Sequence, residues 1–142
     1  MASESIIAAM RDYIASCPLM AEFDSRHRHI DWTKADDDNY GIYPDSDDVV
    51  SSYVDGTEVR KYVCSVVIRK FACQDMDRLS NSEFMERLQD WFEERTEEDN
   101  LPELPCRREA QEITAANAML TELDKQCKYG TYTMQIILTY ER

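Results

Sequence analysis

The chain has 142 residues, of which 43% are hydrophobic and 32% are charged, and its formal net charge is −13. This length corresponds to one domain, residues 1–142, and such a chain can bury roughly two-thirds of the surface that its unfolded form exposes. The acidic excess argues against direct binding of nucleic acid, which needs clustered Lys and Arg, and against docking on an anionic membrane. No stretch approaches the ~18 consecutive apolar residues of a membrane span, and the N-terminus lacks the features of a secretory signal. We therefore expect a single domain that is made and kept in a cytoplasm.

Cysteine and histidine residues show no spacing typical of a metal site. The five cysteines are far apart, without a C-x-x-C pair, and both histidines lie in the polar segment 26–29. Zinc sites need several such ligands at short, regular spacing. We expect reduced, partly buried thiols, and neither a metal nor another cofactor.

The first predicted element is a helix over about residues 5–17. Its apolar residues recur at three- and four-residue spacing, which places them on one helix face. These residues are Ile6, Ile7, Met10, Ile14 and Cys17. Ser3 or Ser5 can cap the first turn, and Pro18 ends the helix because its ring excludes the helical conformation of the preceding residue.

Residues 24–48 are polar and contain two short apolar islands. Ile30 alternates with Trp32, and a second island surrounds Gly41, so we expect a strand, a turn and another strand here. The acidic segments 34–39 and 44–48 are predicted to be solvated loops, since their spacing does not match a calcium-binding loop. Six residues of this region are candidates for contacts with partners: Asp36, Asp37, Asp38, Tyr43, Asp47 and Asp48.

A β-hairpin over about residues 49–71 is the strongest local signal. Asp55 and Gly56 lie between two β-rich runs, and Gly accepts the positive φ of a tight turn without a clash. In the second run, Tyr62, Cys64, Val66 and Ile68 alternate with a mixed set of residues. This pattern predicts a central strand of the sheet, with partial cover on both sides.

An amphipathic helix is expected over about residues 81–98. Ser80 and Glu83 have the spacing of a capping box, which would place the helix start there. Its apolar face consists of Phe84, Leu88, Trp91 and Phe92. Asn100 and Pro102 follow its end.

The last part of the chain predicts further strands, over about residues 110–140. One strand is expected to reach Thr114, and another is expected over residues 119–123. A turn over residues 124–130 precedes a final strand over residues 131–140, whose apolar residues alternate cleanly.

These elements together predict an α+β fold, with a small mixed or antiparallel sheet and two main helices packed on one face. Such a sheet leaves a face and edges uncovered, and uncovered edges indicate either partners or deliberate protection. The aromatic residues Trp32, Tyr40, Tyr43 and Tyr53 belong to types that are enriched in interface cores.

A catalytic site is not expected. The three glycines are isolated, so there is no phosphate-binding loop, and there is no nucleophile elbow. Two other function classes stay open as alternatives. A small cytosolic enzyme, such as a drug-modifying transferase, would need a His or Cys beside a base in a cleft. An acidic regulator that mimics DNA would need carboxylates at phosphate-like spacing on one face.

Several segments, in chain order, resemble the minor capsid proteins of tailed phages and prophages of Gram-positive bacteria. The segments that carry the likeness are residues 53–62, 84–96 and 100–104, the end of the opening helix at Cys17-Pro18-Leu19, and the end of the last strand at Leu138-Thr139-Tyr140. The likeness covers most of the chain and is weakest over residues 106–130. Its motifs are structural and not catalytic.

The resemblance implies a structural virion protein at the head–tail junction, a minor capsid or tail terminator subunit. Proteins of that kind are small α+β subunits that assemble into rings, often of six copies. The implied partners are copies of the chain itself, tail-tube protein and head-completion protein. The implied location is the virion and, during assembly, the cytoplasm of the host bacterium. The acidic loops would then face the lumen or the partner ring.

Overall fold

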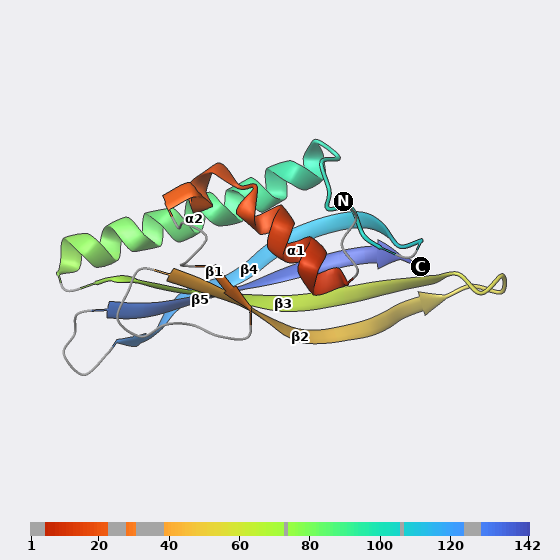
Figure 1. Cartoon of the computed structure of the whole chain (residues 1–142), viewed down its shortest axis with the longest axis horizontal. Coiled ribbons are helices and arrows are strands. Elements are labelled where there is room, and N and C mark those ends of the chain that lie inside the picture. The colour runs from red at the N-terminus through yellow and green to blue at the C-terminus, as the bar shows by residue number, and fades with distance from the viewer. Residues whose placement is uncertain (1–4, 23–27, 31–38, 73, 106, 124–128) are drawn as a thin grey trace.

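The computed structural model describes residues 5–22, 28–30, 39–72, 74–105, 107–123 and 129–142. The elements in chain order are α1 (Ile6–Ala15), a 3₁₀ helix (Pro18–Glu22), β1 (Arg28–Ile30), β2 (Asn39–Ser52), β3 (Glu58–Phe71), α2 (Asp75–Glu97), β4 (Glu109–Leu123) and β5 (Tyr129–Glu141). Figure 1 shows an elongated molecule in which the helices and the sheet form separate layers.

The sheet has the strand order β1-β2-β3-β5-β4. The strands β2, β3, β5 and β4 pair antiparallel in that order, and the short β1 pairs parallel with β2 at the edge. The fold is therefore mixed α+β, as predicted, and β3 is a central strand, as its alternating pattern indicated.

Alternate residues of the strands form the core together with the helices. On β3 these are Tyr62, Cys64, Val66 and Ile68, and on β5 they are Tyr132, Met134, Ile136, Leu138 and Tyr140. They share one buried cluster with apolar residues of both helices. The side chains between them, such as Ser65 and Thr133, are half-buried and make up the other face of the sheet, which we call the open face.

The helix α1 has the expected start and apolar face. The Ser5 hydroxyl accepts the N–H of Ala8 at 3.2 Å, and the side chains of Met10 and Ile14 are fully buried. The Tyr13 ring lies 5.5 Å from the Trp91 ring of α2, so aromatic packing joins the two helices.

The helix α2 begins earlier than the sequence indicated. It starts at Asp75, and the Gln74 N–H donates to the Asp77 carboxylate at 3.0 Å, so the predicted cap at Ser80 and Glu83 is wrong. Acidic residues in the first turn stabilise the helix N-terminus through its dipole, and these are Asp75 and Asp77. Phe84, Leu88 and Phe92 are buried as predicted, and Trp91 is half-buried.

The acidic segment 44–48 is a strand, so its prediction as a loop is wrong. It lies inside β2, whose residues pair with β3 from Asn39↔Arg69 to Ser52↔Glu58. The hairpin therefore begins at residue 39 and not near 49. Because β1 pairs only with residues 40–42, the missing N–H of Pro44 interrupts no pairing with β1. The pairing register shifts between Pro44 and Ser46 and again between Val49 and Ser51, and these irregularities accommodate the sequence within one strand.

The strand β4 is continuous from Glu109 to Leu123, where two strands were expected. A register shift between Ala116 and Met119 marks the predicted break, and there Asn117 has a φ of 57°. The strand β5 begins at Tyr129, so the predicted turn is too long at its end, and residues 124–128 lie outside the described ranges. β1 ends at Ile30, and Trp32 also lies outside them.

Candidate interaction site

The three predicted contact residues that the structure describes all lie on β2, on different faces of the sheet. Asp36, Asp37 and Asp38 lie outside the described residues, whereas Tyr43, Asp47 and Asp48 all lie on β2. The register places Tyr43 opposite Ser65 and Asp48 opposite Lys61, on the open face. Asp47 lies opposite the buried Tyr62 and therefore on the core face.

Asp47 is part of a polar cluster that joins β2 to β5 and β3. The hydroxyl of Tyr140 donates to both of its carboxylate oxygens, at 2.8 and 3.0 Å, and Arg60 lies 3.4 Å away. Arg60 also pairs with Glu58 at 2.9 Å. Burial and then the hydrogen bond to Asp47 raise the pKa of Tyr140, so its hydroxyl stays protonated as a donor. The carboxylate of Asp47 thus binds β5 within the same chain, and its role as a partner contact stays a prediction.

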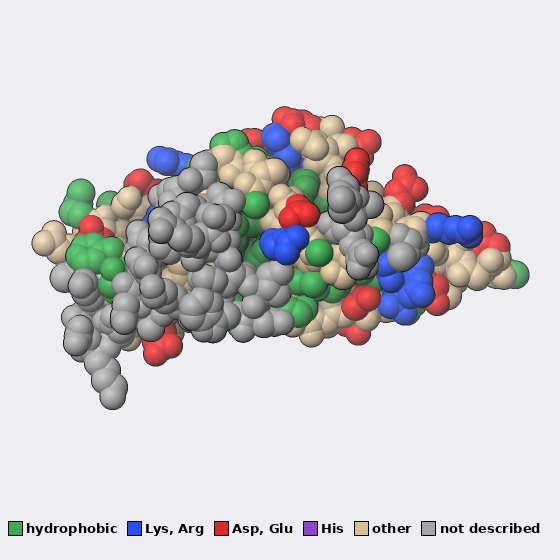
Figure 2. All heavy atoms as spheres, viewed as in Figure 1, with side chains coloured by type: hydrophobic (Ala, Val, Ile, Leu, Met, Phe, Trp, Pro, Cys, Tyr) green, Lys and Arg blue, Asp and Glu red, His purple; other side chains and the backbone are tan. Residues whose placement is uncertain are grey.

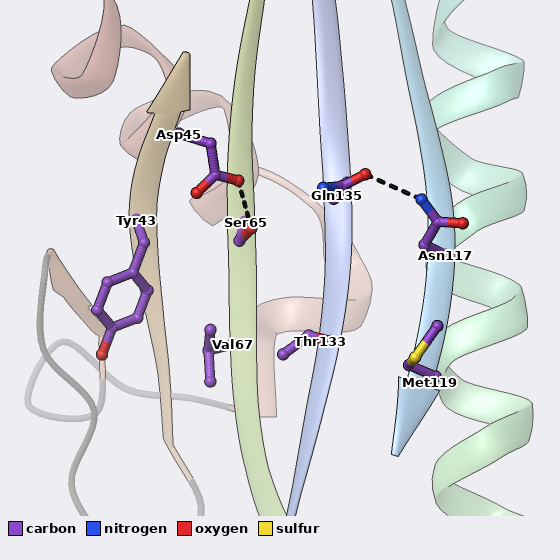
Figure 3. A pocket seen from close by; sticks show the side chains of 8 residues that line it. All are labelled: Tyr43, Asp45, Ser65, Val67, Asn117, Met119, Thr133 and Gln135. Atoms are coloured by element: carbon purple, nitrogen blue, oxygen red, sulfur yellow. Dashed lines mark hydrogen bonds between the residues drawn. The ribbon is translucent and has the colours of Figure 1, made fainter. Parts of the chain in front are cut away.

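A groove of about 520 Å³ crosses the open face over four adjacent strands (Figure 3). Its walls and floor are Tyr43, Asp45, Ser65, Val67, Asn117, Met119, Thr133 and Gln135. The Ser65 hydroxyl donates to the Asp45 carboxylate, and the Asn117 amide donates to the Gln135 carbonyl at 2.9 Å. Two pairs of polar side chains are thus bonded across neighbouring strands, and Val67 and Met119 add apolar contact surface.

The chemistry of this groove suits contact better than catalysis. Its eight side chains include no histidine and no cysteine. The only hydroxyl–carboxylate pair drawn in Figure 3, Ser65 with Asp45, has no third group to orient it as a nucleophile requires. Half-exposed Val67 and Thr133 side chains on a flat strand surface are what a second protein surface can cover.

The described thiols are also unsuited to catalysis. Cys17 and Cys64 are free and buried. Burial raises the pKa of Cys17, and it raises the pKa of Cys64 to about 12. Both groups are therefore protonated at neutral pH, whereas a reactive cysteine needs a thiolate. The expectation of reduced, buried thiols is confirmed for these two residues.

A second hollow, of about 350 Å³, lies between α1 and the end of α2. The Tyr13 hydroxyl donates to the Asn100 carbonyl at 2.7 Å, and burial raises the pKa of Tyr13 to about 12. Arg95 stacks on Trp91 and pairs with Glu98 at 2.8 Å. These polar groups hold the end of α2 against α1, which is a structural role.

Apart from Met119 in the groove, the large exposed apolar side chains of the described residues lie towards the two ends of the molecule. We call the first group the tip surface: Val49, Val50, Tyr53 and Val54, at the turn of the β2–β3 hairpin. We call the second the end surface: Phe71, Met76, Leu79, Leu120 and Leu123, at the end of β3, the start of α2 and the end of β4. Figure 2 shows hydrophobic side chains at both ends, and the hairpin projects beyond β4 and β5 in Figure 1.

The sequence indicated these two surfaces only in part. Tyr53 was recognised as an interface type, but Met76 and Leu79 lie before the predicted helix start at residue 81. One signal was available, because Leu79 and Phe84 are five residues apart and so point to nearly opposite sides of a helix. A continuous helix through both residues places Leu79 away from the core, and it is 57% exposed.

Compared with models of known protein families and with curated proteins, the chain matches none of them. Among the described residues, no helix is both long and apolar enough to cross a membrane. The same residues contain no group of three or more His, Cys, Asp or Glu side chains placed to hold a metal ion.

Proposed function

We propose that this protein is a structural subunit that works by contact with copies of itself and with neighbouring proteins. The observation that carries this proposal is the pair of exposed apolar surfaces on a chain of net charge −13. A high net charge keeps a protein in solution, so the exposed apolar groups are not needed for that. Exposed apolar clusters commonly mark sites of protein contact. The side chain of Val54, at the turn, is 109% exposed and contributes nothing to the core.

We infer further that both helices pack on one face of the sheet and leave the open face for docking. One buried cluster contains residues of α1, α2 and the alternate strand residues, which supports this arrangement. The groove on the open face would then be a second contact surface, distinct from the two ends. The bonds from Ser65 to Asp45 and from Asn117 to Gln135 would keep these four polar side chains partnered when the groove is covered.

The specific role that we propose is a minor capsid or tail terminator subunit at the head–tail junction of a tailed phage or prophage. The resemblance of residues 53–62, 84–96 and 100–104 to that family supports it. The element order of helix, hairpin, helix, hairpin, together with the α+β fold, is compatible with such a subunit. Its partners would be copies of itself in a ring, tail-tube protein and head-completion protein. It would be located in the virion after assembly in the host cytoplasm.

The test is a deletion of the gene in the host that carries it, followed by prophage induction. If the proposal is right, the deletion yields full heads and separate tails, and a plasmid copy of the gene restores joined, infectious particles. Mass spectrometry of purified wild-type particles should then detect this chain. Normal infectious particles from the deletion strain would overturn the proposal.

A further inference from the structure

The register of the sheet shows which side chains share the open face. Cross-strand partners lie on the same side of a sheet, so each set of partners forms a row across β2, β3, β5 and β4. Such rows follow one another along β3 from Val59 to Arg69. Three consecutive rows contain no charged residue. They consist of Ser46, Val63, Ile137 and Thr114, then Tyr43, Ser65, Gln135 and Ala116, and then Gly41, Val67, Thr133 and Met119.

The charged side chains of the open face lie around these uncharged rows. Two are basic, Lys61 and Arg69, and they lie on β3 on either side of the uncharged rows. Six are acidic, so the rim of the face has a net charge of −4. The acidic residues are Asp45, Asp48, Glu109, Glu112, Glu122 and Glu141. Among the described residues, the open face thus has an uncharged middle within an acidic rim.

This distribution of charge favours an acidic partner on the open face. The helix α2 contains eight acidic and three basic residues, for a net charge of −5, and its Phe84, Leu88 and Phe92 belong to the buried cluster of the core face. A partner rich in Lys and Arg would therefore be attracted to α2 more than to the sheet. An acidic partner meets the least repulsion where the surface carries no charge. A second copy, with its own net charge of −13, is such a partner.

The open face also has the area that a specific dimer needs. The stretch of β3 from Val59 to Arg69 spans roughly 36 Å, and four strands are roughly 19 Å wide. Asn39 and Gly41 are buried, so that corner is not accessible, and roughly 600 Å² remains on each copy. Two copies would bury about 1,200 Å² together, which reaches the lower limit for specific and stable interfaces.

We propose that the open face of one copy packs on the open face of a second copy, in a dimer with a two-fold axis between the sheets. This rests on the proposed function, because it names a surface through which that subunit would associate with itself. Two sheets packed in this way lie about 10 Å apart, and the half-buried side chains of Val63, Val67 and Ile137 become part of a shared core. A contact of one surface with itself is isologous, so it closes at two copies and leaves the tip surface and the end surface to other partners.

Two opposite charges at one position test the two-fold contact. Gln135 lies near the middle of the face, on the interior strand β5, and its side chain is exposed. Gln135→Lys and Gln135→Glu each place like charges close together in a dimer of identical copies. The matched controls are Glu93→Gln and Arg87→Gln, at exposed positions of α2, because they change the net charge in the same two directions and by the same amount. Far-ultraviolet circular dichroism and thermal unfolding check that each variant is folded.

The readout is sedimentation equilibrium of the full chain from micromolar to millimolar concentration, at low and at high salt. We expect the wild type and both controls to dimerise, and each Gln135 variant to dimerise at least tenfold more weakly, because like charges meet in a contact that excludes water. An equimolar mixture of the two Gln135 variants should associate more strongly than either variant alone, because opposite charges then meet. High salt should strengthen the wild-type dimer, because it screens the repulsion between the two acidic rims.

Any of four results would overturn the dimer. They are a wild type that is monomeric at millimolar concentration in high salt, Gln135 variants that dimerise as strongly as the controls, a mixture that associates no more strongly than either variant, and a wild-type dimer that weakens as salt rises. Each of these leaves the head–tail role open, because the gene-deletion test measures that role independently. Conversely, normal particles from the deletion strain combined with stronger association in the mixture would refute the role and keep the dimer.

Discussion

A single hydroxyl group joins α2 to the edge of the sheet, and its removal has a calculable effect. Thr96 donates to the Ile113 carbonyl and accepts the Ile113 N–H at 3.0 Å. Thr96→Val keeps the shape of the side chain and removes both hydrogen bonds. It leaves two backbone groups of β4 without a partner, beside a buried Ile113 side chain.

The expected cost follows from those two groups. A buried donor or acceptor without a partner costs about 1–3 kcal/mol. Both groups are only partly buried, so water can reach them, and we take the lower value for each. Thr96→Val should therefore lower the free energy of unfolding by about 2 kcal/mol, which lowers the Tm of a domain of this size by roughly 8 °C.

Urea unfolding followed by tryptophan fluorescence measures the change, and hydrogen exchange of the Ile113 amide locates it. The matched control is Thr121→Val, which removes one exposed hydrogen bond, from the Thr121 hydroxyl to the Thr131 carbonyl at 3.1 Å. The control should cost less than about 1 kcal/mol. If Thr96→Val costs no more than Thr121→Val, or leaves the Ile113 amide equally protected, Thr96 does not hold the sheet edge.

Two further perturbations test the packing and the buried hydroxyl and thiol groups. Gly130→Ala should lower the free energy of unfolding by about 1–3 kcal/mol, because a Cβ there would lie 2.9 Å from Cδ1 of Leu120 and 3.1 Å from Cβ of Ala72; a thermal melt equal to that of the wild type would contradict this close packing. Stability should fall as the pH rises from about 9 to about 12, because folding raises the pKa of Tyr13 and of Cys64 to about 12, so the unfolded state loses these protons first. Urea unfolding at pH 8 and pH 11 measures that slope, and Tyr13→Phe should reduce it; an unchanged slope in this variant would exclude Tyr13 as a source.

The strongly periodic parts of the chain could be predicted because one face of each element is buried. The alternation of Tyr62, Cys64, Val66 and Ile68 on β3 repeats the geometry of a pleated strand, and all four side chains are buried. Gly56 has a φ of 92°, as its place in the hairpin turn indicated. In these places, local preference and tertiary burial favour the same structure.

The errors come from places where a tertiary partner overrides local preference. Residues 44–48 have the composition of a loop, yet β3 supplies a full antiparallel partner, and Ser65 and Tyr140 bind the carboxylates of Asp45 and Asp47. The sequence of residues 44–48 alone does not reveal these partners. The start of α2 was misplaced for a similar reason, because two acceptable caps, at Gln74 and at Ser80, compete within six residues. The first is used since Arg78 also binds the Ala72 carbonyl and so fixes the preceding turn.

On β2, acidic side chains make hydrogen bonds within the chain, whereas apolar side chains near its turn are exposed. Composition alone suggests the reverse. Asp45 and Asp47 are the expected surface charges, but their carboxylates accept hydrogen bonds from β3 and β5 and so fix the register of the hairpin. Val50 and Val54 are the expected core residues, but they project at the turn, where no side chain of the same copy can cover them. The charges of this hairpin thus have partners within the chain, whereas its valines at the turn have little apolar cover. Covering these valines with a second protein surface would remove apolar area from water, and that gain is what the proposed contact with other proteins predicts.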